Sequence, residues 1–130
     1  MPPDHAETLQ NENAEQAVLG AVLIAPEALS VVREKVGADD FSPRNRPIYL
    51  GILSLADHGK PADLITLTDE LRDRGLLDQC GGTAYISGLT SAIPSAANVA
   101  YYADIVQEAA IRRRFLNLSN TIKEQIFSPG

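Results

Sequence analysis

Asn98–Phe127 reads NVAYYADIVQEAAIRRRFLNLSNTIKEQIF and contains neither a proline nor a glycine. Asn98 can cap the helix that this stretch predicts, because an asparagine side chain accepts a hydrogen bond from an orphan amide of the first turn. A helix of about 29 residues is about 44 Å long. A compact body of about 100 residues has a radius of gyration of only about 13 Å, so we expect the helix to project beyond it.

The apolar side chains of this helix change face near Ala110–Ile111. If Tyr102 defines zero and each residue advances about 100°, then Ile105, Val106 and Ala109 lie within about 60° of Tyr102. A second apolar seam lies on the opposite side of the helix, at about 160–240°: Ile111, Phe115, Leu118, Ile122 and Ile126. We therefore expect the first half to pack on its own domain. The second half should face another element, either a missing partner helix or a second protomer.

The sequence before Asn98 predicts a compact bundle of about five shorter helices. Residues 1–12 are polar and are expected to form a flexible tail. Residues 13–97 are expected to form the globular body. Its first helix is apolar over much of its surface and should be central, starting at Asn13 with Gln16 completing a capping box. Caps, prolines and glycines predict four further helices: Pro26–Val36, Pro43–His58, Leu67–Arg74 and a short helix capped by Thr83.

Long alternation of apolar and polar residues, the signal of a strand, is almost absent from the chain. The fold class is therefore predicted to be all-α, with residues 98–127 as one long helix after the body. Residues 128–130 are interpreted as a truncated end, so that the chain would be a fragment of a longer protein.

The charge of the chain is negative and unevenly distributed. Its formal net charge is −6, but residues 1–110 hold 7 basic and 16 acidic side chains, whereas residues 111–130 hold four basic side chains and one acidic. An acidic body argues against direct binding of nucleic acid, which depends on Lys and Arg neutralising phosphates. Such asymmetry can instead steer a protein partner or a second copy.

Neither a signal peptide nor a membrane-spanning run is recognisable in the sequence. Cys80 is the only cysteine, which excludes an intramolecular disulfide and is compatible with a reducing compartment. We therefore expect a cytoplasmic protein without membrane contact.

Catalytic and metal-binding patterns are missing from the sequence. Gly59-Lys60 is followed by Pro61 and does not form a phosphate-binding loop. The two histidines, His5 and His58, have no neighbouring cluster of metal ligands. We therefore predict no catalytic residue, cofactor site or metal site in this chain.

Three other groups of residues each admit a chemical and a structural interpretation. Asp39-Asp40 could bind a metal, but an aspartate ahead of a helix usually caps it. Cys80 has no basic neighbour in sequence to activate it, so packing is favoured. The run Arg112–Arg114 could contact phosphates, although a short basic patch on an acidic protein more often faces solvent or a protein.

Several strings, in this order, resemble the N-terminal domain of DnaB-type bacterial replicative helicases. They cover about residues 12–115: EQAVLGAVL (15–23), Asp40-Phe41 with Arg46 and Ile48-Tyr49, PADLITL (61–67), GGTAYISGL (81–89), PSAAN (94–98) and Tyr102–Val106. One departure is Asn45, where the family commonly has histidine before the arginine. Asparagine can still accept and donate hydrogen bonds at that position.

The resemblance implies a scaffold and docking domain. In such helicases the long helix is the first arm of a helical hairpin, and N-terminal domains pair through these hairpins to form a collar on the hexamer. The collar docks the C-terminal domain of a DnaG-type primase at the replication fork, and takes part in loading, which implies a helicase loader as a further partner. ATP and Mg²⁺ belong to a C-terminal ATPase domain that this sequence does not contain.

The candidate interaction residues lie mainly on the second seam of the long helix. They are Tyr85, Ile111, Arg112, Arg113, Phe115, Leu118 and Ile122. Ordinary core packing is the competing interpretation, and it is strongest for Tyr85. A competing function is a free-standing phage or plasmid adaptor that binds host primase or helicase. A reading frame that continues into a phosphate-loop motif would favour the helicase over the adaptor.

Overall fold

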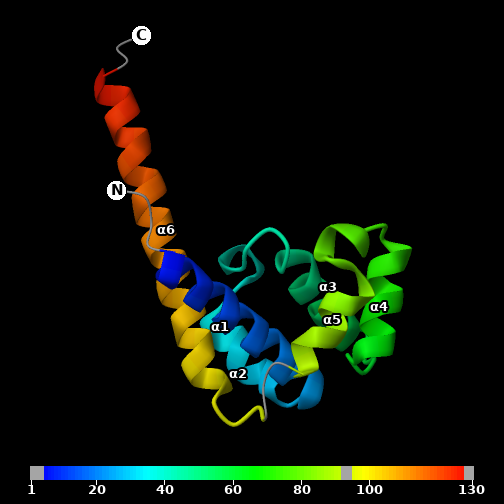
Figure 1. The fold of residues 1–130 in the computed structure, drawn as a ribbon. Coiled ribbons are helices and arrows are strands. Elements are labelled where there is room, and N and C mark those ends of the chain that lie inside the picture. The colour runs from blue at the N-terminus through cyan, green and yellow to red at the C-terminus, as the bar shows by residue number, and fades with distance from the viewer. Residues whose placement is uncertain (1–4, 92–94, 128–130) are drawn as a thin grey trace.

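The computed structural model describes the backbone of residues 5–91 and 95–127, and the side chains of residues 11–91 and 95–127. Within those ranges the fold is entirely helical, as predicted, and contains no strand. The elements follow one another as α1 (His5–Ile24), α2 (Ala28–Lys35), the short 3₁₀ helix η1 (Ala38–Asp40), α3 (Arg46–Asp57), α4 (Leu64–Asp73), the 3₁₀ helix η2 (Asp78–Cys80), α5 (Gly82–Ser91) and α6 (Val99–Phe127). The short helices form a body from which α6 projects (Figure 1).

Helix α1 runs through the centre of the body. It contacts α6, α5 and α2 (Figure 1), which explains why its apolar residues occupy more than one face. Val18 and Leu19 are completely buried although they are adjacent in sequence. Adjacent residues on a helix point about 100° apart, so burial of both requires packing partners on two sides. The predicted central position of this helix is confirmed.

The predicted start of α1 is wrong. The helix begins at His5, eight residues before the expected cap at Asn13, so most of the expected tail is helical. No proline or glycine lies between His5 and Asn13. Extending an existing helix by one residue is much easier than nucleating a new one, so the polar segment continues the helix that the buried part nucleates. Residues 1–4 lie outside the described residues.

The starts of α2 and α3 are also later than predicted. Pro26 lies in the turn before Ala28, and Pro43 lies in a turn in which the amides of Asn45 and Arg46 bond to the carbonyl of Ser42. The proline in the first turn of helix α3 is Pro47, not Pro43. Proline suits both a turn and a first helical turn, so its position alone does not distinguish the two.

Helix α4 begins three residues before the prediction because Asp63, and not Thr66, is its N-cap. The Asp63 carboxylate accepts from the Thr66 amide at 2.9 Å, and the Thr66 hydroxyl accepts from the Asp63 amide at 2.9 Å. This reciprocal box satisfies two amides that the first helical turn would otherwise leave unpaired. The short helix α5 begins at Gly82 and not after Thr83.

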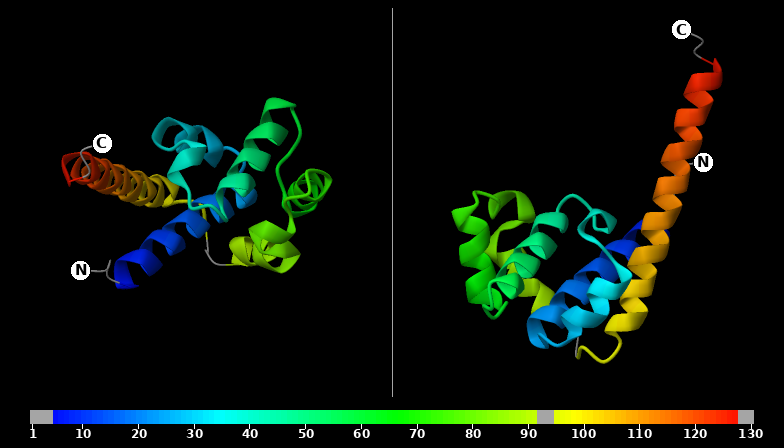
Figure 2. Two further views of the ribbon diagram at one scale, coloured as in Figure 1. Left: turned by 90° about the horizontal axis from the view of Figure 1, so that it is seen from above. Right: turned by 180° about the vertical axis from the view of Figure 1, so that it is seen from behind.

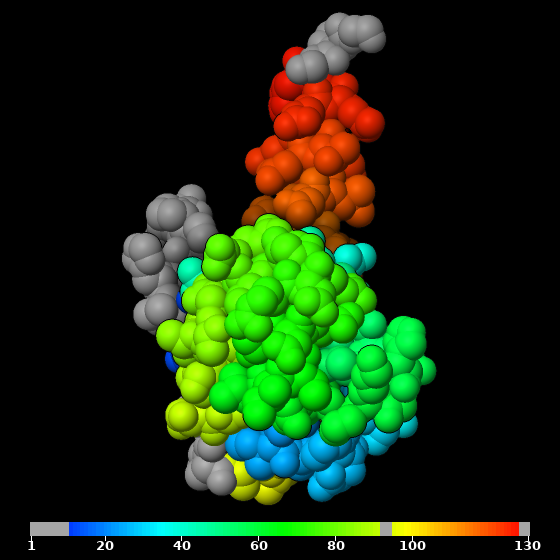
Figure 3. Space-filling model, turned by 90° about the vertical axis from the view of Figure 1, so that its right-hand side faces the viewer, coloured from blue at the N-terminus to red at the C-terminus, as the bar shows by residue number. Residues whose placement is uncertain are grey.

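Helix α6 begins one residue after Asn98 and ends at Phe127, as predicted. Its first half packs on α1 and α2 and touches η1. Seen from behind, the helix passes along the body and continues well beyond it (Figure 2). The space-filling view shows the last part of α6 standing clear above the body (Figure 3). Residues 92–94, which contain the predicted break at Pro94, and residues 128–130 lie outside the described residues.

Candidate protein-interaction surface

The projecting part of α6, residues 111–127, is exposed along its whole length. We call it the distal arm. In the first half of the helix Val99, Ala103, Val106, Ala109 and Ala110 are buried. The boundary between buried and exposed residues therefore falls at Ala110–Ile111, where the sequence predicted that the apolar seam changes face.

The second apolar seam is exposed to solvent. Phe115 is 69% exposed and Ile122 is 48% exposed. Ile111, Phe115 and Leu118, together with Arg114, line a shallow apolar depression on the arm. Other large apolar side chains of the arm are also exposed: Leu116, Ile126 and Phe127. An apolar strip of this kind on a single helix marks an interaction surface, because an unpartnered strip would keep much hydrophobic area in water.

The arm is attached to the body by polar contacts at its root. The Arg114 guanidinium donates to the Asp40 carboxylate, and Arg113 donates to the Asp40 backbone carbonyl at 3.1 Å. Asp40 also accepts from the amide of Gly37 at 2.8 Å. It lies inside η1, as the third residue of that helix, and not ahead of a helix as the capping interpretation expected. Arg113, a predicted partner contact, therefore bonds to its own body, although it is exposed on the arm like Arg112.

Tyr85 lies apart from the arm. It is half-buried on α5 and lines a depression together with residues of α1 and of the segment 42–45, none of which belongs to α6. Its hydroxyl donates to the Asn45 side-chain carbonyl at 2.6 Å, and the Arg44 guanidinium lies 5.0 Å from the centre of its ring. Burial raises the pKa of Tyr85 above its ordinary value of 10.0, which keeps the hydroxyl protonated as a donor.

Glu15 completes the network around Tyr85, and the sequence reasoning did not find it. One Glu15 carboxylate oxygen accepts from the Asn45 side-chain amide at 2.9 Å and from the Ser42 backbone amide at 2.8 Å. Both Glu15 and Asn45 are buried. A buried acid has to be hydrogen-bonded to be tolerated. The only sequence signal was an acidic residue at the start of an apolar run.

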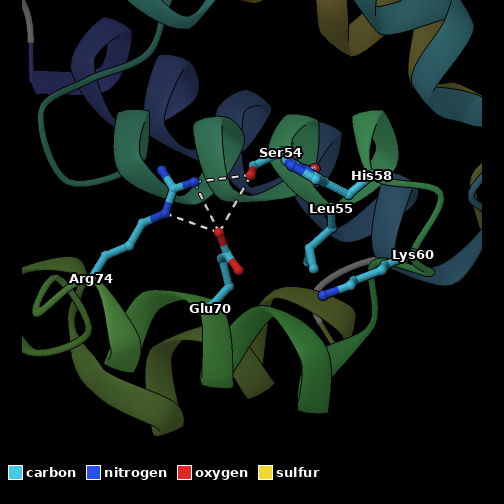
Figure 4. Close-up of a pocket in the computed structure, with 6 residues that line it drawn as sticks. All are labelled: Ser54, Leu55, His58, Lys60, Glu70 and Arg74. Atoms are coloured by element: carbon cyan, nitrogen blue, oxygen red, sulfur yellow. Dashed lines mark hydrogen bonds and ion pairs between the residues drawn. The ribbon is translucent and has the colours of Figure 1, made fainter.

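A polar pocket lies between α3 and α4 (Figure 4). Arg74 donates to the Ser54 hydroxyl at 2.9 Å and pairs with Glu70 at 2.9 Å. The His58 ring nitrogen Nδ1 lies 2.7 Å from the Ser54 carbonyl. The Ser54 hydroxyl also donates to the Glu70 carboxylate in a longer bond of 3.4 Å. These contacts brace α3 and α4 against each other.

Metal-ligand geometry and cysteine chemistry can be examined directly among the described residues. No group of three or more His, Cys, Asp or Glu side chains is arranged to hold a metal ion in that part of the chain. Cys80 is buried, and burial raises the pKa of its thiol, which disfavours the reactive thiolate. No helix of the described part is long and apolar enough to cross a membrane.

The fold is thus a compact helical body from which one long helix projects with its apolar side chains exposed. Residues 7–108 match the family model of the DnaB-like helicase N-terminal domain, and the chain belongs to this family. The replicative DNA helicase DnaC of Bacillus subtilis is 43% identical over 116 residues, which cover 88% of this chain and 26% of that protein. The chain thus spans about a quarter of the length of such relatives.

Solved structures agree with the family assignment. The crystal structure of the N-terminal domain of DnaB helicase from Mycobacterium tuberculosis is 37% identical, with a TM-score of 0.89, and the match covers 100% of this chain and 87% of that one. The structure of a DnaB-like replicative helicase and its interactions with primase is 27% identical, with a TM-score of 0.74, covering 88% of this chain and 27% of that one.

Proposed function

We propose that this chain is the N-terminal scaffold and docking domain of a replicative DNA helicase. Copies of the chain pair through their distal arms, build the collar of a hexamer and dock the C-terminal domain of a DnaG-type primase during DNA replication. The observation that supports the proposal is the apolar seam of the arm. Its side chains are exposed between residues 111 and 127, whereas large exposed apolar side chains of the described body are few and scattered.

Pairing of arms is the simplest way to cover the seam. Two helices that present apolar faces of similar length bury both faces at once, and closed symmetric pairs are the commonest assemblies of soluble proteins. The same face can be covered by the second arm of a hairpin within the parent helicase. ATP hydrolysis with Mg²⁺, and strand translocation, belong in this proposal to the remainder of that helicase and not to the chain described here.

Primase docking is proposed from the family and from the solved helicase that was described with its interactions with primase. A helicase loader is a further candidate partner. The test is to titrate the chain with the C-terminal domain of a DnaG-type primase from a related bacterium. Binding is measured by isothermal titration calorimetry and checked by co-elution of the two proteins. Saturable binding is expected. Absence of heat and of co-elution at high micromolar concentrations of both proteins would overturn the primase proposal.

A further inference from the structure

Asp40 joins the body to the root of the arm through two of its groups, the side-chain carboxylate and the backbone carbonyl. Its side chain is only 10% exposed and pairs with Arg114. Its carbonyl oxygen accepts from Arg113, and its carboxylate also accepts from the amide of Gly37. Asp40 belongs to η1, whereas the arginines lie 73 and 74 residues later in the chain. One buried residue therefore connects the region between α2 and α3 to the point where α6 leaves the body.

The contact lies where α6 leaves the body, so a change there alters the direction of the whole arm. Below it, α6 is held by its buried side chains and by a second ion pair, Lys35 with Asp104 at 2.8 Å. Above it, every residue to Phe127 is exposed, and the helix contains no proline or glycine at which it could bend. A small rotation of the root therefore moves the end of the arm by many ångströms.

We propose that Asp40 is a positioning residue of the arm: through Arg113 and Arg114, and together with the packed first half of α6, it fixes the direction in which the apolar seam leaves the body. A buried carboxylate suits this role, because loss of either partner leaves a poorly solvated charge or an unpaired donor at the contact. The effect of Asp40 on the pairing of two arms rests on the self-association proposed above. An arm held in one direction meets a second arm without first losing orientational freedom.

The direct test measures the direction of the arm by spin-label distances. Labels are placed at Asp73→Cys on α4 and Asn120→Cys on the arm, both of which are exposed, while buried Cys80 stays unlabelled. Labelled chain is diluted with unlabelled chain so that only distances within one molecule contribute. Asp40→Asn and Arg114→Gln each break the ion pair from one side. Asp39→Asn is the matched control, because its carboxylate is 90% exposed and lies 3.9 Å from Arg46.

The expected result is one narrow distance distribution for the parent chain and for Asp39→Asn. Asp40→Asn and Arg114→Gln should each give a broad distribution, or one shifted to a new distance. A distribution as narrow as that of the parent chain, at the same distance, in both variants would overturn the proposal. If Asp40→Asn does not fold, as judged by circular dichroism, Arg114→Gln decides alone.

A second readout separates this proposal from the proposed function. Light scattering should show an apparent dissociation constant for self-association about tenfold higher in Asp40→Asn, because fewer arms point in the pairing direction. An unchanged constant together with a broadened distribution would overturn the link between Asp40 and pairing. If the parent chain is monomeric at every concentration, the proposed self-association fails, while the distance measurement still decides whether Asp40 positions the arm.

Discussion

Asn45 illustrates how a single polar residue connects separate elements of this fold. It precedes α3, accepts from the hydroxyl of Tyr85 on α5 and donates to the Glu15 carboxylate on α1. The sequence comparison singled it out as a departure from the family, where histidine is common. The structure shows that asparagine satisfies both neighbours, since its side chain can accept and donate at the same time. This dual role also explains its almost complete burial.

Tyr85→Phe removes the donor of the 2.6 Å bond and leaves the Asn45 carbonyl oxygen without its partner. We expect the free energy of unfolding to fall by about 1 kcal/mol, the cost of an unmade buried hydrogen bond. Urea denaturation followed by circular dichroism measures it. Tyr101→Phe is the matched control, because Tyr101 is 64% exposed and should not change the midpoint. Equal stability of both variants would show that the bond to Asn45 contributes nothing.

Asp63→Ala removes the N-cap of α4 and should lower stability by about 1 kcal/mol at neutral pH. The bond from the Thr66 amide holds the pKa of Asp63 below its ordinary value of 3.8. The contribution of the carboxylate is therefore present above pH 3.8 and is lost as the pH falls through the lowered pKa of the folded state. Denaturation of both proteins at several pH values should show the difference shrinking only below pH 3.8. A difference that disappears nearer neutral pH would contradict this cap assignment.

At the scale of elements, the sequence was most informative about α6. An uninterrupted stretch from Asn98 to Phe127 and one change of apolar face were sufficient to predict both the length of the helix and the residue at which it leaves the body. The start of α1 was missed because residues 5–12 are mostly polar, although Asp4 ahead of His5, with Glu7 three residues later, has the sequence pattern of a capping box. The contact between Arg114 and Asp40 was missed because the two residues are 74 positions apart, and a local sequence pattern does not indicate such a long-range contact.

Because every residue of the distal arm is exposed, removing most of the arm should not destabilise the body. A chain that ends at Asn117 keeps Arg113 and Arg114 on Asp40 but lacks most of the exposed seam. We expect its thermal midpoint to equal that of the parent chain when both are measured by differential scanning calorimetry at a low protein concentration. A midpoint lower by several degrees would mean that the arm packs on its own body.

At the scale of the whole molecule, the charge distribution and the exposed seam support the same function. We expect the acidic body to disfavour direct binding of DNA, whereas residues 111–130 carry four basic side chains and one acidic. The family could be inferred from ordered strings of sequence, and the family model confirms it over residues 7–108. Which partner covers the seam could not be inferred, because an apolar face is complementary to many apolar faces.

The central claim is that the apolar seam of the distal arm joins one copy of the chain to another. The most direct test is the molar mass in solution, measured by multi-angle light scattering over a range of concentrations. We compare the parent chain with Phe115→Asp/Ile122→Asp, and with Asn117→Asp/Asn120→Asp, which adds the same charge to the other face of the arm. We expect the parent chain and the second variant to form dimers or larger assemblies, and the first variant to be a folded monomer. A parent chain that stays monomeric, or equal masses for all three proteins, would contradict the account.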